Sequence, residues 1–548
     1  MNQINLIEDT SKIGLPVYRY KNIYLHSKYD PLKEAQRFVE KKYEAASLQI
    51  LIGYGNGYIY EELKNKIKKD EKIIVIDSFI SPNIADSSLN EFTHQAIQDF
   101  LNQHIKVTDS INLLISINYE KIIEDSPELQ LFVKSLNDRI RSNQITENTI
   151  TYFISQWNEN YLKNLKYAYN DHSIRELFSE KNLPVVVASG GPSLTKQLDL
   201  VKQYRESIIL IAAGTTINSL LSQGIKPDLV VSVDGGEVNY QHFKDLKITD
   251  FPLIYCPTVH YGIRENFKHA YYCFLTMEEQ LIPHYEKYAN DSVETLIGGS
   301  SVANVAYNLA LFLTNGPVAL IGQDLAFTDG FTHAKGNLNR IENKNTEMLL
   351  REGYYGDLVK TNGVFLQMKE AFEFIQSKLL AHNRSYNCTE GGLNIESFQN
   401  ISFCEFLKTY AQKPVEIQYS YPTVEENLTS YRRQLLKDIQ QYEGIIILFE
   451  RALKVLKSNV SKVSYEEQVL KKLEKIDSKI KKEIQDTNLS YAFSTINLHV
   501  LRYFRSSKNA SREEEFALSF KQSEYMYEEM LKVTRQTVDI LNTLKEEV

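Results

Sequence analysis

Apolar residues in the first part of the chain occur in short runs that alternate with helical patterns. Strands are predicted at Leu48–Ile52, Ile73–Ile76 and Asn112–Ser116. Runs of four or five apolar residues, bounded by glycine or polar residues, are typical of strands that are buried on both faces of a parallel sheet. The pattern predicts a Rossmann-like N-terminal domain over residues 1–155.

The same alternation continues more regularly from residue 156 to residue 410. Helical patterns, such as Leu198–Tyr204, Thr216–Gln223 and Val302–Thr314, separate the apolar runs. The predicted strands are Val185–Ala188, Ile208–Ala212, Leu229–Val233, Leu253–Cys256, Tyr271–Leu275 and Val318–Gly322. Because nearly all of these strand residues are apolar, we expect a doubly wound α/β domain with helices on both faces of a parallel sheet.

The last region, residues 420–548, has a different pattern. Gly444 is its only glycine, and no proline follows Pro422. Apolar residues recur at helical spacing among Lys, Glu and Gln, as in Leu470, Leu473, Ile476 and Ile480. This predicts a C-terminal α-helical domain, either a bundle or helical hairpins, with a helical protein as its expected partner.

Composition narrows the class of protein. The chain has 548 residues and a net charge of −8, which disfavours a nucleic-acid binder. It has no apolar run of about 18 residues, as a membrane span needs, and its N-terminus carries acids where a signal peptide is basic. The four cysteines form no CxxC pair. We therefore expect a cytoplasmic protein with buried thiols and no membrane contact.

Two glycine-rich turns follow predicted strands. Gly53–Gly57 follows the first strand, and Asp77 lies twenty residues further on, as in dinucleotide-binding units. The alternatives are a live cofactor site and a Rossmann-like relic that serves packing. Ser189–Ser193 leads from a buried strand into a helix, where backbone N–H groups would hold a phosphate.

Small and polar residues also follow the other strands of the central region. Ligands of open α/β sheets bind beyond the carboxyl ends of the strands, so these positions predict a nucleotide site. The residues predicted to bind the nucleotide are Ser189, Gly190, Gly191, Pro192, Ser193, Gly214, Thr215, Thr216, Gly299, Ser300, Ser301 and Gln323.

Catalytic candidates lie at the same strand ends. Asp234 is suited to hold a ribose hydroxyl, a metal or a substrate amine, or it forms a turn. Asp324 is either part of a hydrogen-bond network or a base. His333 lies in a nearby polar loop, and His260 is a weaker candidate of the same kind. HExxH, GxSxG and Walker A motifs are absent, which disfavours a zinc protease, an α/β-hydrolase and a P-loop kinase.

Several short motifs occur together over roughly residues 15–405. They are Tyr24–Pro31 with Gly53–Gly57, Ala188–Leu194, Gly224–Asp228 with Asp234, Gly298–Ala303, Leu320–Gly330 with His333, and Asn387–Gly392. In combination, these motifs resemble those of the motility-associated factor (Maf) flagellin glycosyltransferases.

The resemblance implies transfer of a nonulosonic acid, such as pseudaminic or legionaminic acid, from its CMP-activated form to serine or threonine of flagellin. Its central domain is similar to bacterial sialyltransferases, which would put Gly190–Ser193 on the CMP donor and Gly299–Ser300 near the donor carboxylate. The region that corresponds to the sialyltransferases' catalytic histidine, Tyr354–Lys360, contains no histidine. Asp357, His333, Asp324 and Asp234 are therefore the alternatives for the base.

Two other functions stay open. The central domain also resembles archaeal 6-hydroxymethylpterin pyrophosphokinases, which would use ATP and magnesium with Asp234 or Asp324 as metal ligand. A non-catalytic flagellin-binding protein is the third hypothesis. The transferase itself needs no cofactor beyond the CMP-sugar, because backbone N–H groups at Gly190–Ser193 can stabilise the leaving phosphate. Magnesium dependence and the oligomeric state are left open.

Overall fold

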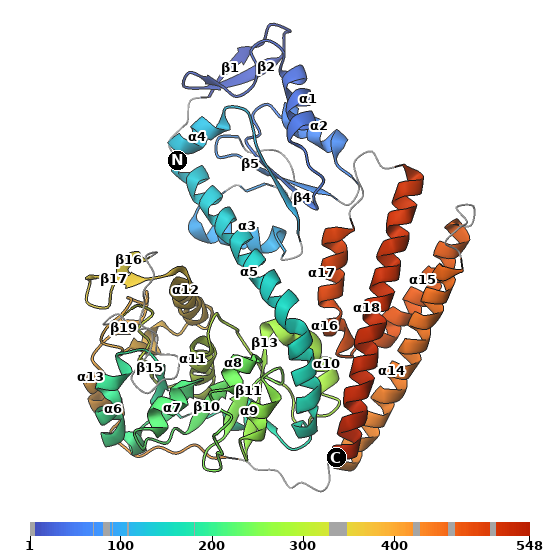
Figure 1. Cartoon of the computed structure of the whole chain (residues 1–548). Helices are drawn as coiled ribbons and strands as arrows, with labels where there is room; N and C mark the ends of the chain where they lie inside the picture. Colours follow the sequence, from blue (N-terminus) through green and yellow to red (C-terminus); the bar gives the residue numbers. More distant parts are fainter. Residues whose placement is uncertain are drawn as a thin grey trace. The chain divides into compact units, whose positions relative to one another are not determined.

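The computed structural model describes residues 6–68, 71–80, 88–89, 91–106, 109–179, 181–327, 348–419, 428–458, 466–504 and 511–548 (Figure 1). The chain forms two compact units. Unit 1 comprises Met1–Tyr152 with Leu498–Leu518, and unit 2 comprises Phe153–Asn497 with Ser519–Val548. The predicted α/β fold class with a helical C-terminal region is confirmed. The predicted boundaries between three domains stay a prediction.

Unit 1 contains a three-stranded parallel sheet in the order β5-β4-β6. Its strands are β4 (Leu48–Ile52), β5 (Lys72–Ile76) and β6 (Ile111–Ile115), which confirms the three predicted strands to within one residue at either end. The helices are α1 (Pro31–Lys42), α2 (Tyr58–Lys66), α3 (His94–His104), α4 (Tyr119–Asp125) and the first part of α5 (Pro127–Asn164). A small antiparallel sheet precedes them, formed by β1 (Leu6–Thr10), β2 (Pro16–Tyr20) and β3 (Ile23–Tyr24).

Unit 2 is built on a nine-stranded parallel sheet in the order β19-β18-β15-β8-β9-β10-β11-β12-β7. The predicted strands correspond to β8 (Val185–Ala188), β9 (Ile209–Ala213), β10 (Leu229–Ser232), β11 (Leu253–Tyr255) and β15 (Val318–Ile321). Every residue of these five strands is buried, as their continuous apolar sequences predict. The sheet also contains β7 (His172–Ser173), β12 (Ala270–Tyr272), β18 (Ser385–Asn387) and β19 (Gln399–Asn400).

The prediction of one strand over Tyr271–Leu275 is wrong. The structure divides this segment into β12 and β13 (Phe274–Leu275), and β13 pairs with β14 (Thr295–Leu296) in a separate sheet. The Cys273 N–H still donates to the Tyr255 carbonyl of the large sheet, but the Phe274 N–H donates to the Glu294 carbonyl. The chain thus changes sheets within one residue, and the unbroken apolar run does not show this change.

Helices cover the large sheet, and α11 (Val302–Leu313) packs against β8, β9, β10 and β15. The other helices of this part are α6 (Leu194–Gln203), α7 (Thr216–Leu221), α8 (Glu237–Tyr240), α9 (Tyr261–Glu265), α10 (Ile282–Tyr285), α12 (Gly363–Lys378) and α13 (Phe403–Tyr410). A hairpin of β16 (Leu349–Glu352) and β17 (Leu358–Thr361) lies between β15 and α12 in the sequence.

The C-terminal region is helical in its described residues, as predicted. Its helices are α14 (Leu428–Lys457), α15 (Glu466–Ile484), α16 (Leu489–Ala492), α17 (Ser494–Tyr503) and α18 (Arg512–Glu547). Helices α14 and α15 pack against each other within unit 2. Within the described ranges, none of the helices combines the length and the apolar character that crossing a membrane requires.

Candidate functional site at the strand ends of unit 2

The central sheet has a topological switch point between β8 and β15. From β8, the chain adds β9, β10, β11 and β12 on one side of the sheet, and then returns to add β15, β18 and β19 on the other side. Connections leave the sheet in opposite directions at such a point, which opens a crevice at the carboxyl ends of the two strands. The Ser189–Ser193 turn and the Gln323-Asp324 pair follow these two strands.

Asp324 holds the glycine-rich turn. Its Oδ2 atom accepts from the Ser193 hydroxyl at 2.7 Å and from the Ser193 N–H at 3.2 Å. The Gly191 N–H donates to the Gly322 carbonyl at 2.8 Å, and the Ser189 N–H donates to the Ile321 carbonyl at 2.9 Å. Most of the donors that we predicted for a phosphate are therefore engaged by the protein. The Gly190 N–H of this turn forms no hydrogen bond within the described residues.

Three glycines allow the backbone segments of this site to approach one another. A Cβ at Gly191 would lie 2.1 Å from Asp324 Oδ2, and one at Gly322 would lie 2.3 Å from the Ser189 carbonyl oxygen. Gly392 has a φ of +73°, and its Cβ would lie 2.0 Å from the Asp324 carbonyl oxygen. No larger residue fits these positions. The Asn387–Gly392 motif, which sequence analysis left outside the site, therefore lies beside Asp324.

Buried polar atoms without a hydrogen-bond partner gather on three neighbouring strands. They are Ser189 Oγ after β8, Gln323 Oε1 after β15, and Asn387 Nδ2 at the end of β18, each unpaired within the part of the chain that the structure describes. All three residues are less than 10% exposed. Buried polar atoms are rarely left unpaired, because each costs about 1–3 kcal/mol. The arrangement fits a site whose ligand supplies the missing partners.

Two asparagines, one helical turn apart on α5, form hydrogen bonds with the loops that follow β10 and β11. Asn160 Nδ2 donates to the Gly235 and Thr258 carbonyls at 3.0 and 3.2 Å. Asn164 Nδ2 donates to the Pro257 and Val259 carbonyls at 2.8 and 2.9 Å. Both side chains are buried, so they fix the loops that carry Asp234 and His260.

Asp234 is exposed, and its carboxylate accepts from the Gly236 N–H at 2.8 Å, which is the turn-forming role that sequence analysis left open. His260 is nearly buried between the rings of Tyr240 and Tyr261, whose centroids lie 4.4 and 4.8 Å away. Burial lowers the pKa of His260, against the opposing effect of Glu237.

Glu237 is a candidate that sequence analysis did not consider. The His260 Nδ1 atom accepts from the Gly262 N–H at 3.2 Å, so the ring proton lies on Nε2, which is 3.1 Å from Glu237 Oε2. The histidine therefore orients a carboxylate that is 60% exposed at the sheet edge. Glu237 is the first residue of the short helix α8, and a helix of four residues gives no periodic signal in the sequence. His260 lies 23 residues further on, so only the fold shows that the two residues form a pair.

The start of α11 approaches the turn after β9. A Cβ at Gly214 would lie 3.7 Å from Val302, the first residue of α11. Ser301 is the N-cap residue of α11, and its N–H and its hydroxyl both donate to Asn304 Oδ1 at 3.1 Å. Gly299 and Ser300 are exposed next to it, while Thr216 is buried at the start of α7 with Thr215 before it. The fold thus brings these predicted residues to the same sheet edge.

The remaining candidates separate. His333 lies outside the described residues. Asp357 is exposed in the β16–β17 hairpin, where its carbonyl accepts from the Gly353 N–H at 2.6 Å. The hairpin joins the exit of β15, since the Phe327 N–H donates to the Lys360 carbonyl. Among the described residues, no three His, Cys, Asp or Glu side chains are placed to hold a metal ion.

Side chains of unit 1 accept hydrogen bonds from the backbone N–H groups of its glycine-rich turn. Asp77 Oδ2 accepts from the Tyr54 N–H at 2.8 Å, the Gly55 N–H at 3.3 Å and the Tyr119 hydroxyl at 2.6 Å. The Asn56 N–H donates to His26 Nε2 at 3.1 Å. The acid that would bind a ribose instead holds its own turn, so the geometry favours a packing role over a cofactor site.

His26 predicts a pH dependence of unit 1. Burial lowers the pKa of His26 from 6.5 to about 4. Below pH 6.5 this histidine binds a proton in the unfolded chain but stays neutral in the folded chain. The free energy of unfolding should therefore fall between about pH 6.5 and pH 4, by up to about 3 kcal/mol. Urea unfolding across this range measures the effect. His26→Gln keeps an acceptor for Asn56 and should flatten the profile, whereas replacing the exposed His94 by Gln should leave it unchanged; an unaltered profile in H26Q contradicts the assignment.

The parallel sheet of unit 2, with a candidate ligand site at the carboxyl ends of its strands, defines a doubly wound α/β protein. Residues 159–330 match a family model described as 6-hydroxymethylpterin diphosphokinase MptE-like. The fold is similar to that of a Maf glycosyltransferase from Magnetospirillum magneticum AMB-1, with a TM-score of 0.60 and 15% sequence identity, covering 99% of this chain and 93% of that one. No curated protein matches the chain. The resemblance to Maf proteins that the motifs indicate thus extends to the fold of nearly the whole chain.

Proposed function

We propose that this protein is a glycosyltransferase that moves a nonulosonic acid from its CMP-activated form to serine or threonine of flagellin, in the cytoplasm and in support of flagellum assembly and motility. The unpaired polar atoms of Ser189, Gln323 and Asn387 carry the proposal, because they mark a ligand site at the switch point. The fold shared with a protein named as a Maf glycosyltransferase supports the reaction class.

In the proposed reaction, the acceptor hydroxyl attacks the anomeric carbon while the bond from that carbon to the CMP phosphate oxygen breaks. The configuration inverts, and a base on the protein takes the hydroxyl proton. The Gly190 N–H and the orphaned polar side chains are the groups available to the leaving CMP. Activity measured before and after chelation tests whether the step depends on magnesium.

Glu237, oriented by His260, is our choice for the base. Glu237→Gln should lower kcat by at least about 100-fold and change KM for the CMP-sugar little, because the carboxylate acts on the acceptor proton. Asp234→Asn is the matched control on the same loop. A comparable loss in D234N with full activity in E237Q would assign the base to Asp234.

The overall activity is tested by intact-mass analysis of flagellin that is co-expressed with this protein and a CMP-nonulosonate pathway. We expect a mass increase by whole nonulosonate units, and its loss when the protein is omitted. An unshifted flagellin mass, with the CMP-sugar confirmed in the cells, would contradict the proposed transfer.

A second candidate function is an ATP-dependent pyrophosphokinase of the pterin type, which the family match over residues 159–330 favours. Thermal stability with CMP, or with ATP and magnesium, separates the two candidates. Stabilisation by CMP and not by ATP supports the transferase, and the reverse result supports the kinase. If this protein binds flagellin but neither modifies it nor binds a nucleotide, the result would instead indicate the non-catalytic binding protein.

A further inference from the structure

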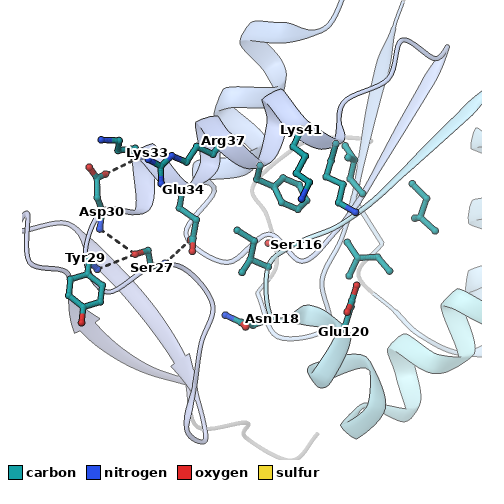
Figure 2. Close-up of a pocket in the computed structure, with 16 residues that line it drawn as sticks. Ser27, Tyr29, Asp30, Lys33, Glu34, Arg37, Lys41, Ser116, Asn118 and Glu120 are labelled. Atoms are coloured by element: carbon teal, nitrogen blue, oxygen red, sulfur yellow. Dashed lines mark hydrogen bonds between the residues drawn. The ribbon is translucent and has the colours of Figure 1, made fainter.

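A groove of about 720 Å³ lies in unit 1, between α1 and the segment that contains β6 (Figure 2). Lys33, Arg37 and Lys41 of α1 form one wall. Residues 113–118 form the opposite wall as an unbroken stretch. The side chains of consecutive strand residues point to opposite faces of the sheet. A groove that is lined by every residue in a row must therefore lie along the backbone edge of the strand.

The open side of β6 faces this groove. The Ser116 N–H donates to the Ile52 carbonyl, and the Ser110 carbonyl accepts from the Leu48 N–H, so even-numbered residues of β6 direct their backbone groups toward β4. In a parallel strand the odd-numbered residues then direct theirs to the other side. In the described sheet of unit 1, β6 is an edge strand, and no further strand takes up these groups.

The side chains of Leu113 and Ile115 confirm that their backbone lines the groove. Both pack in the core on the sheet face opposite to α1, together with Ile50 and Ile52. Leu114 packs on the α1 face instead, with Ala35 and Val39. The groove therefore presents N–H and C=O groups of the strand beneath the cationic face of α1.

The edge of β6 lacks the usual protection against strand addition. Its sequence, Ile111-Asn-Leu-Leu-Ile115, contains neither a charged residue nor a proline. Natural edge strands are generally blocked by lysine, proline or a bulge, because an open apolar edge pairs with other strands. An unprotected edge beside a groove is the arrangement that binds an extended peptide by strand addition.

The cations of α1 have the spacing that such a peptide requires. Lys33, Arg37 and Lys41 lie four residues apart, which separates them by about 6 Å along the helix. Alternate side chains of a strand are separated by about 6.6 Å. None of the three cations has an ion-pair partner among the described residues. Three acids also line the groove. Asp30 caps α1 through the Lys33 N–H, and Glu34 accepts from the Ser27 N–H at 2.7 Å. Glu120 is exposed in the first turn of α4, outside the row of cations on α1.

We propose that this groove binds an extended, acidic polypeptide segment, which adds as a strand beside β6 and sets alternate Asp or Glu side chains against Lys33, Arg37 and Lys41. The occupant is a different protein, because two copies of this face would bring like charges together. Binding of this segment does not require the transferase reaction, and a binding measurement alone detects it.

The test uses the full-length protein and a fluorescein-labelled peptide, Thr-Glu-Val-Glu-Val-Glu-Thr, in fluorescence anisotropy at low salt. We expect saturable binding, with at least about a tenfold loss of affinity in the Arg37→Glu variant, since the substitution reverses one charge contact. Lys64→Glu is the matched control, because Lys64 is an exposed lysine of α2 outside the groove. Both variants should keep the wild-type melting temperature, since the substituted side chains are exposed.

One further peptide separates strand pairing from charge attraction. A version with N-methylated valines keeps the charges but lacks N–H groups on one edge, and it should bind at least tenfold more weakly. Equal binding of the methylated peptide, equal loss in K64E and R37E, or absence of saturable binding each overturns the proposal. A stable dimer in sedimentation that R37E abolishes would overturn it in favour of a second copy as the occupant.

Discussion

Replacing Asp438 by alanine is expected to destabilise unit 2 by about 3–5 kcal/mol, as measured by urea unfolding. Asp438 of α14 is 1% exposed, and its Oδ2 atom accepts from the Tyr288 hydroxyl at 2.5 Å and lies 2.8 Å from His284 Nε2. Removing the carboxylate leaves both groups buried without their acceptor. The loss exceeds that of a surface pair because water cannot replace the missing partner.

The network around Asp438 ties the helical region to the α/β part of unit 2. The Tyr161 hydroxyl of α5 lies 2.7 Å from His284 Nδ1, and the Tyr442 hydroxyl of α14 lies 3.1 Å from His284 Nε2. Tyr442 also donates to Asn488 at 2.7 Å. Because α5 and α14 both contact His284 of α10, the helical region and the sheet should lose structure in a single transition in the wild-type protein.

Acid should weaken the same network. Burial alone would raise the pKa of Asp438, but the hydrogen bond and charge of His284, with the Tyr288 hydroxyl, hold it below its ordinary value. The stabilisation is therefore present above about pH 4, the ordinary range of an unfolded Asp, and is lost as the pH falls further. Asp539→Ala, on an exposed position of α18, is the control and should change stability by less than about 0.5 kcal/mol. An equal effect of the two substitutions would contradict the assigned role.

Strands and helices of this chain could be predicted because their signals are local. Val185–Ala188 and Leu48–Ile52 are predicted to the residue, since a buried parallel strand needs a continuous apolar run. The strand-end rule also brought Ser193, Asp234 and Asp324 to one edge of the sheet. The prediction of one strand over Tyr271–Leu275 failed because the chain passes from one sheet to another at Cys273, inside one apolar run. The hydrophobic pattern does not indicate which strand a segment pairs with.

Roles of the site residues could not be predicted in the same way, because partners decide them. Asp324 is 131 residues from Ser193, and whether its carboxylate faces a ligand or the turn depends on the register of β15 against β8. Asp77 repeats this relation in unit 1, where it binds the Gly53–Gly57 turn. In both units, a carboxylate at the end of the neighbouring strand in the sheet accepts hydrogen bonds from backbone N–H groups of a glycine-rich turn. Those N–H groups would otherwise be available to an anion.

The role of Asp324 can be decided by two substitutions. Asp324→Ala should cost about 2–6 kcal/mol, at about 1–3 kcal/mol for each of the two donors, and abolish activity, because the Ser193 N–H and hydroxyl then stay buried without an acceptor and the turn loses its anchor. Asp324→Asn retains an oxygen that can accept both bonds but removes the charge. If Asp324 anchors the turn, as the geometry indicates, D324N should cost about 1–2 kcal/mol and keep at least a tenth of the activity.

A catalytic base would give the opposite pattern, which makes the comparison informative. The amide of D324N cannot take a proton, so a base at this position predicts a loss of kcat by about 100-fold or more with stability nearly unchanged. Ser193→Ala supplies the matched control, because it removes one of the two bonds to Oδ2 from the other side. Additive stability losses of S193A and D324N would show that the two groups do not act through their contact, whereas a double variant no less stable than D324N alone would locate the function of Asp324 in holding the turn.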